Sequence, residues 1–75
     1  MNFGRALAAL KMGFSVSRKG WNGKNMWLGL QEPDEQSKMT QPYIYLKTNT
    51  GDVVPWLASQ TDMLSEDWTV RSEEG

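Results

Sequence analysis

Apolar side chains near the start of the chain recur at the spacing of one helix face. The positions that follow the i, i+3, i+4, i+7 pattern are Phe3, Ala6, Leu7 and Leu10. Asn2 can cap this helix, Lys11 complements its C-terminal dipole, and Gly13 is a suitable residue to end it. The pattern predicts a helix over about residues 2–12 whose apolar stripe packs on a sheet.

After this helix the apolar spacing changes to two, which is typical of strands. The segments that alternate in this way are 14–18, 25–31 and 43–48. In the second segment, Leu28 and Leu30 face one side, and Trp27 and Gly29 face the other. Gly29 therefore either leaves room for an aromatic ring or marks a bulge.

The third strand is predicted to return through a hairpin turn at residues 49–52. The returning strand should reach Pro55, which either ends the ladder or lies at a sheet edge because it has no N–H to donate. Ser59 or Thr61 can then cap a short helix that runs to about residue 65.

We expect Leu57 and Leu64 to point inward from this short helix, and a last strand to include Trp68 and Val70. The polar stretch 32–41 is predicted to be a loop. The order of elements predicts a single domain over residues 1–75 of the α+β class, with an N-terminal helix packed on a small antiparallel sheet and a short second helix near the C-terminus.

Composition limits how such a domain can be stabilised. A core in a chain of 75 residues rarely supplies more than about 3–5 kcal/mol. The sequence has no cysteine and no histidine, which excludes disulfides and the common zinc sites. Oligomerisation is therefore the expected source of extra stability. The absence of a long apolar run and of a signal-peptide pattern predicts a soluble cytosolic protein with no membrane partner.

Charge is distributed unevenly along the chain. Residues 1–31 contain five cations and no acid, a net of +5, whereas residues 32–75 contain three cations and nine acids, a net of −6. This asymmetry indicates either an anionic ligand at the basic part or mutual attraction of the two halves. The isoelectric point near 5.2 argues against a general grip on long DNA, which needs a broad basic face.

Polar binding chemistry is densest in the turn-like segment 18–27, which places cations, amides, indoles and glycines within ten residues. Arg18 and Lys24 could hold phosphates, and Trp21 and Trp56 could stack on bases or ribose faces. Hydroxyls and base edges could be recognised by Asn22, Ser59, Gln60, Thr61 and Asp62. We assign Trp27 and Trp68 to the core or an interface, and Lys19 to solubility.

A catalytic interpretation has less support in the sequence. No histidine or cysteine is available as a base or nucleophile. Asp62 acting as a general base through water is the alternative that the residues leave open. Asp67 is expected to be solvated, and a metal site made of carboxylates alone is not indicated. No cofactor is predicted.

Two blocks of the sequence carry a resemblance to a known family. They are Arg18-Lys19-Gly20-Trp21-Asn22-Gly23-Lys24 and Pro55-Trp56-Leu57-Ala58-Ser59-Gln60-Thr61-Asp62, accompanied by Pro42-Tyr43-Ile44 and Asp67-Trp68. From residue 2 to about residue 70 the chain resembles the phage Thoeris anti-defence proteins, long known only as a domain of unknown function.

The resemblance implies a sponge that binds a cyclic ADP-ribose isomer without cleaving it, and so keeps a Thoeris-type effector inactive in the host bacterial cytoplasm. It also implies a homotetramer with ligand pockets between subunits and, for some members, binding of cyclic oligonucleotides at a separate site. The matching positions make a predicted ligand-binding set of Arg18, Trp21, Asn22, Lys24, Tyr43, Trp56, Ser59, Gln60, Thr61 and Asp62. Two other hypotheses stay open: a nucleotide-degrading enzyme, and a structural or interaction protein whose tryptophans are interface anchors.

Overall fold

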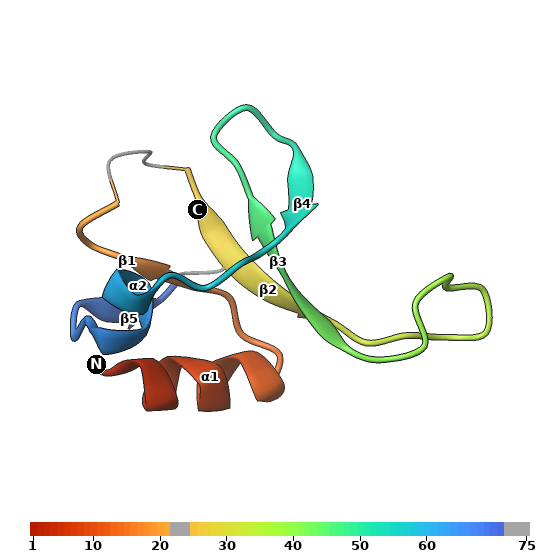
Figure 1. The fold of residues 1–75 in the computed structure, drawn as a ribbon, viewed down its shortest axis with the longest axis horizontal. Helices are drawn as coiled ribbons and strands as arrows, with labels where there is room; N and C mark the ends of the chain where they lie inside the picture. The colour runs from red at the N-terminus through yellow and green to blue at the C-terminus, as the bar shows by residue number, and fades with distance from the viewer. Residues whose placement is uncertain (22–24, 72–75) are drawn as a thin grey trace.

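A computed structural model describes residues 1–21 and 25–71. Its elements in chain order are α1 (Phe3–Lys11), β1 (Val16–Arg18), β2 (Trp27–Gln31), β3 (Tyr43–Lys47), β4 (Val53–Pro55), α2 (Gln60–Leu64) and β5 (Trp68–Val70). The strands form one antiparallel sheet in the order β4-β3-β2-β1-β5. Helix α1 packs across one face of this sheet, and α2 contacts α1 (Figure 1). The predicted α+β class, with its N-terminal helix and short second helix, is confirmed.

Helix α1 begins and ends where the sequence predicts. The Asn2 side chain accepts a hydrogen bond from the Arg5 N–H at 2.9 Å, which satisfies one of the free donors of the first turn. Gly13 follows the last turn with φ 96°, a backbone conformation that suits glycine at a helix end. The buried side of α1, which includes Ala6 and Leu10 at 0% exposure, covers the sheet.

The sheet separates two kinds of surface because side chains alternate along its strands. Val16 pairs with Leu28, and Leu28 pairs with Leu46, so the apolar side chains at these positions share the face under α1. Val16, Leu28 and Trp68 are almost completely buried there. This face is the core of the protein.

On the opposite face of the sheet, Gly29 provides space for an aromatic ring. Gly29 pairs with Tyr45 across β2 and β3, and a Cβ placed on Gly29 would lie 2.5 Å from Tyr45 Cζ. The ring therefore occupies the space that a side chain would fill. Of the two interpretations of Gly29, the one that leaves room for a ring is confirmed.

In the C-terminal half, the prediction for Pro55 is confirmed, and the prediction for Leu57 and Leu64 is wrong. Pro55 pairs with Tyr45 on the edge strand β4, where its missing N–H does not break a central ladder. Leu57 and Leu64 were expected to point inward, but they are 92% and 78% exposed. For Leu64 the reason is that α2 has only five residues and turns Asp62 toward the protein, whereas Leu57 lies in the segment between β4 and α2.

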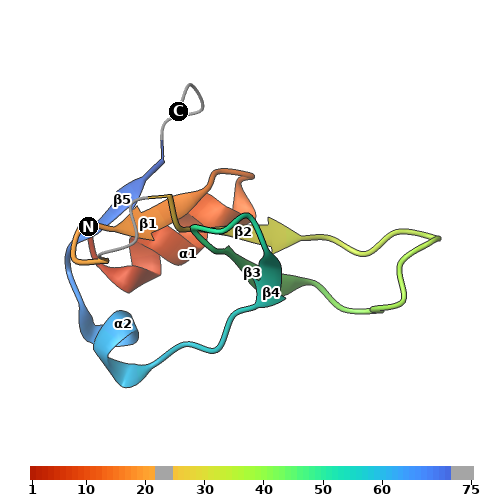
Figure 2. The same cartoon turned by 90° about the horizontal axis from the view of Figure 1, so that it is seen from above.

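The segment between β2 and β3 is a loop, as predicted, and it projects away from α1 and α2 in both views (Figures 1 and 2). Asp34 organises part of it by accepting a hydrogen bond from the Gln36 N–H at 2.9 Å. This loop and α2 therefore lie at opposite ends of the long axis of the molecule.

Candidate functional site

Arg18 lies at the centre of a polar cluster that joins three distant parts of the chain. Its Nη1 donates to Asp62 Oδ1 at 2.7 Å, and its Nε donates to Asp67 Oδ1 at 2.8 Å. The side chains of Arg18 and Asp62 are each only 16% exposed. The end of β1, helix α2 and the residue before β5 are thereby held together by charge-assisted hydrogen bonds.

Asp67 also binds the backbone of the turn that follows β1. Its Oδ2 accepts a hydrogen bond from the Gly20 N–H at 2.8 Å, and its carbonyl accepts one from the Lys19 N–H at 3.1 Å. A Cβ on Gly20 would lie 2.9 Å from that carboxylate oxygen, so only glycine allows this approach without a shift. Asp67 was expected to be solvated, and its side chain is 31% exposed, but its carboxylate is also ion-paired with Arg18.

Two tryptophans flank the same cluster. Trp21 Nε1 donates to Asp62 Oδ1 at 3.3 Å, and its ring meets the Trp68 ring edge-on with centroids 5.4 Å apart. Trp56 meets Trp68 edge-on at 6.1 Å and also contacts Phe3. Trp68 is 1% exposed, which confirms it as a core residue. Trp21 and Trp56 are half-buried, so part of each indole faces solvent.

Helix α2 positions Asp62 through its own cap. Ser59 Oγ accepts a hydrogen bond from the Asp62 N–H at 3.0 Å, and Trp68 Nε1 donates to the Asp62 carbonyl at 2.9 Å. Gln60 and Thr61, in the first turn of α2, are exposed. Of the predicted ligand-binding set, the structure brings together Arg18, Trp21, Trp56, Ser59, Gln60, Thr61 and Asp62.

The electrostatics of the cluster favour fully ionised groups. Partial burial works to raise the pKa of Asp62, but the interactions with Arg18, Ser59 and Trp21 outweigh it and hold that pKa below its usual value. The Arg18 guanidinium and then the Gly20 N–H lower the pKa of Asp67. The hydrogen bonds to Asp67 and Asp62 raise the pKa of Arg18. One cation and two carboxylates leave a net charge of −1 on these three side chains.

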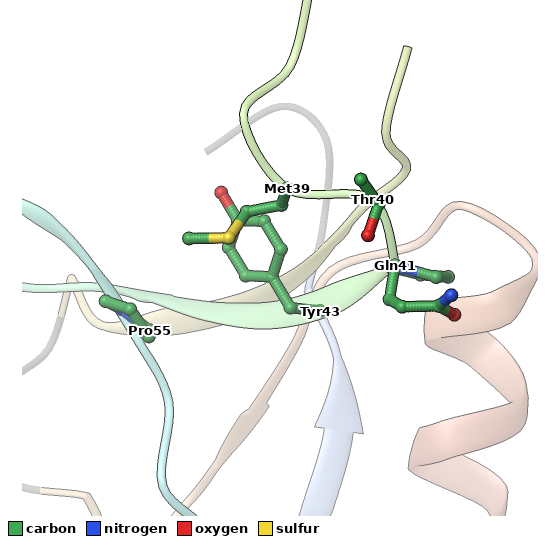
Figure 3. A pocket seen from close by; sticks show the side chains of 6 residues that line it. Met39, Thr40, Gln41, Tyr43 and Pro55 are labelled. Atoms are coloured by element: carbon green, nitrogen blue, oxygen red, sulfur yellow. The ribbon is translucent and has the colours of Figure 1, made fainter.

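Tyr43 lies apart from this cluster. It begins β3 opposite Gln31, at the far end of β2 from the segment that pairs with β1. A pocket of about 340 Å³ opens beside it, and Figure 3 shows the residues around that pocket. They are Met39, Thr40, Gln41, Pro42, Tyr43 and Pro55. The predicted ligand-binding set is therefore divided between two places.

Two predicted site residues, Asn22 and Lys24, lie outside the described residues. Across residues 1–21 and 25–71, no group of three acidic, histidine or cysteine residues is placed to hold a metal ion. No helix within the same ranges has both the length and the apolar character needed to cross a membrane.

Sequence reasoning missed Asp67 and Gly20. The signal that pointed to Asp67 was the opposite charge of the two halves, for which mutual attraction was one of the two interpretations. The structure confirms that attraction at Arg18, which pairs with carboxylates 44 and 49 residues later in the chain.

Comparison with known proteins places nearly the whole chain in one family. The model of the Thoeris anti-defense 2-like domain matches residues 1–71. A curated relative, Thoeris anti-defense 2 of Bacillus phage SP01, is 40% identical over an alignment 85 positions long, gaps included, which covers 96% of each chain.

Proposed function

Because the chain belongs to the Thoeris anti-defense 2-like family, we propose that it is a phage anti-defence protein that sequesters a nucleotide immune signal in the host cell. The signal we propose is a cyclic ADP-ribose isomer, which the protein binds without cleaving. The observation that carries this proposal is the cluster around Asp62, where half-buried indoles stand beside an ordered guanidinium and carboxylate.

The cluster retains hydrogen-bonding capacity for a ligand. A carboxylate has about four lone-pair sites, and Asp62 uses two of them for the side chains of Arg18 and Trp21. A guanidinium has five N–H groups, and Arg18 uses three of them on Asp62 and Asp67. Asp62 can thus accept from a ribose hydroxyl or an exocyclic amine while Arg18 offers its remaining N–H groups to a phosphate.

The same chemistry favours binding over catalysis. A general base works best when its pKa lies near the operating pH, whereas the interactions around Asp62 lower its pKa. The sequence contains no histidine or cysteine to replace it. The nucleotide-degrading enzyme is therefore the less supported alternative.

Exposed leucines beside α2 support a homotetramer in which pockets lie between subunits. Leu57 and Leu64 are 92% and 78% exposed, and neighbouring Met63 is 42% exposed. An apolar surface of this kind next to a polar cluster is typical of an interaction site. In the assembly that we propose, a second subunit covers these leucines and completes the pocket around Asp62.

The remaining predicted residues have defined places in the proposal. Asn22 and Lys24, which follow Trp21 in the sequence, belong to the proposed ligand-binding set on the strength of their sequence position. Tyr43 and its pocket are our candidate for a second kind of ligand, the cyclic oligonucleotides.

Calorimetry with synthetic cyclic ADP-ribose isomers tests the proposal. We expect Trp21→Phe, which keeps an aromatic ring but removes the N–H bonded to Asp62, and Asp62→Asn to weaken binding about tenfold. Trp27→Phe is the matched control, because Trp27 lies on the opposite face of the sheet beside Tyr45. Equal affinity in all four proteins would remove Trp21 and Asp62 from the site.

Recovery of the ligand separates the alternatives. After incubation and denaturation of the protein, ligand of unchanged mass supports sequestration, and a changed mass identifies an enzyme. If no isomer or cyclic dinucleotide raises the melting temperature, the interaction protein without a small ligand becomes the better hypothesis.

A further inference from the structure

Asp67 is held in place by the core rather than by the site it faces. The next residue, Trp68, is 1% exposed, and its backbone N–H donates to the Met1 carbonyl at 3.1 Å. The Asp67 carbonyl accepts from the Lys19 N–H. Its side chain therefore starts from a backbone that is fixed by both the N-terminal segment and the end of β1.

From this fixed point both carboxylate oxygens of Asp67 are used. Oδ1 accepts from Arg18 Nε at 2.8 Å, while Oδ2 accepts from the Gly20 N–H at 2.8 Å and from Arg18 Nη2 at 3.4 Å. The absence of a Cβ on Gly20 is what allows the turn to approach Oδ2 so closely. One side chain thus orients both the guanidinium and the backbone that leads to Trp21.

The other side of the guanidinium bonds to Asp62. An arginine that is anchored on both sides loses its rotational freedom during folding instead of during ligand binding, which lowers the entropic cost of binding. Without Asp67, Arg18 would keep a single anchor, its hydrogen bond to Asp62.

We propose that Asp67 is a positioning residue for the ligand site: through Arg18 and Gly20 it holds Arg18, Asp62 and Trp21 as one preformed surface, and it does not touch the ligand itself. The inference rests on the proposed function, because it concerns how that site is ordered. In this proposal Arg18 has two roles. Its charge is balanced within the protein by Asp62 and Asp67, and its remaining N–H groups can bind a phosphate of the ligand.

The test compares Asp67→Asn with Glu66→Gln in the full chain. Both variants remove one negative charge at adjacent positions, but Glu66 is exposed and its side chain makes no hydrogen bond to the described residues. We expect Asp67→Asn to weaken binding of the cyclic ADP-ribose isomer by about tenfold, and Glu66→Gln to leave it unchanged within about twofold. Gly20→Ala, which crowds the Asp67 carboxylate and the Arg18 guanidinium bonded to it without altering charge, should also weaken binding.

A nitrogen–proton correlation spectrum of Arg18 reports positioning independently of affinity. We expect a resolved Nε–H signal in the unmodified protein and in Glu66→Gln, and its shift or loss through solvent exchange in Asp67→Asn. The inference is wrong if Asp67→Asn displaces the Arg18 Nε–H signal but binds the isomer with unchanged affinity. It is also wrong if Asp67→Asn weakens binding while the Arg18 signal stays unchanged. If the unmodified protein binds no isomer at all, the proposed function is wrong, and so is the inference that rests on it. If Asp67→Asn does not fold, Gly20→Ala replaces it in the comparison. Its far-ultraviolet circular dichroism spectrum and melting temperature should be close to those of the unmodified protein.

Discussion

At two positions in this protein, glycine allows another side chain to pack directly against the backbone. Gly29 lies under the Tyr45 ring, and Gly20 lies against the Asp67 carboxylate. Alternation along β2 and the neighbouring Trp27 indicated that Gly29 could make room for a ring, but they did not identify which ring. That identity depends on the register of β2 with β3, in which Gly29 pairs with Tyr45.

We expect Gly29→Ala to destabilise the fold by about 1–3 kcal/mol, because the new methyl group forces the Tyr45 ring away from its packed position. Urea denaturation at neutral pH measures the change. Gly4→Ala is the control, since its added Cβ would make only ordinary contact at 3.5 Å with Asn2 and alanine favours a helix by about 0.5–1 kcal/mol. A loss of stability that is no larger for Gly29→Ala than for Gly4→Ala would contradict the role of the ring.

The Arg18 cluster should make stability depend on acid pH. The pKa values of Asp62 and Asp67 are lower in the folded protein than the usual value of about 3.9. The unfolded chain therefore binds more protons in this range, so the stabilisation is present above about pH 4 and is lost as pH falls through the folded values. We expect the urea midpoint to be flat between about pH 7 and 5 and to decline below about pH 4.

Arg18→Gln isolates this contribution from other carboxylates such as Asp34, whose pKa is also lowered, by hydrogen bonds from Gln36 and Ser37. The variant should be less stable at neutral pH, and its midpoint should approach that of the unmodified protein as pH falls. If the urea midpoints of Arg18→Gln and the unmodified protein differ by the same amount at every pH from 7 to 3, the ion pairs do not stabilise the fold.

Sequence reasoning at the residue scale found Arg18, Trp21 and Asp62 but not how they meet. The contacts between them span 41 and 44 residues, a separation that no local pattern reports. Asp67 was missed for the same reason, because its pairing depends on the antiparallel match of β1 with β5, which places Arg18 opposite Trp68.

The secondary-structure elements were predicted more completely than their contacts. The cap and end of α1, the turn before β4 and the edge position of Pro55 follow from local chemistry, and each was confirmed. The orientation of α2 was wrong because one turn of helix has no period long enough to define a buried face. The tertiary contacts of Asp62 with Arg18, Trp21 and Trp68 decide which side of α2 points inward.

The Ser59 cap should therefore affect both stability and the proposed site. We expect Ser59→Ala to cost about 1 kcal/mol, because the Asp62 N–H loses its acceptor, and to weaken ligand binding because Asp62 is no longer held. Asn2→Ala is the matched control: it removes the equivalent cap of α1, so it should lower the melting temperature by a similar amount without changing affinity. Equal loss of affinity in both variants would mean that general destabilisation, and not the position of Asp62, explains the effect.

At the scale of the whole molecule, the chain places charge inside and apolar side chains outside around α2. The attraction between the basic and acidic halves is satisfied within one subunit at Arg18, so it does not require a second chain. The leucines of the α2 region are different, because the described residues of the subunit leave them uncovered. The exposed leucines of the α2 region are therefore our candidate surface for the expected oligomerisation. The sequence pattern had assigned these leucines to the core.

We expect the protein to elute at a mass near four times its 8.5 kDa chain in size-exclusion chromatography with light scattering, and Leu64→Ser to shift it toward smaller species. Burial of a leucine side chain is worth about 1.5–3 kcal/mol, and a tetramer would lose this amount at each copy. Met12→Ser is the control, because Met12 is 74% exposed but follows the last turn of α1 and does not belong to the α2 surface. If Leu64→Ser assembles as before while Met12→Ser dissociates, the interface lies at the end of α1, and the proposed pocket must be completed without the α2 leucines.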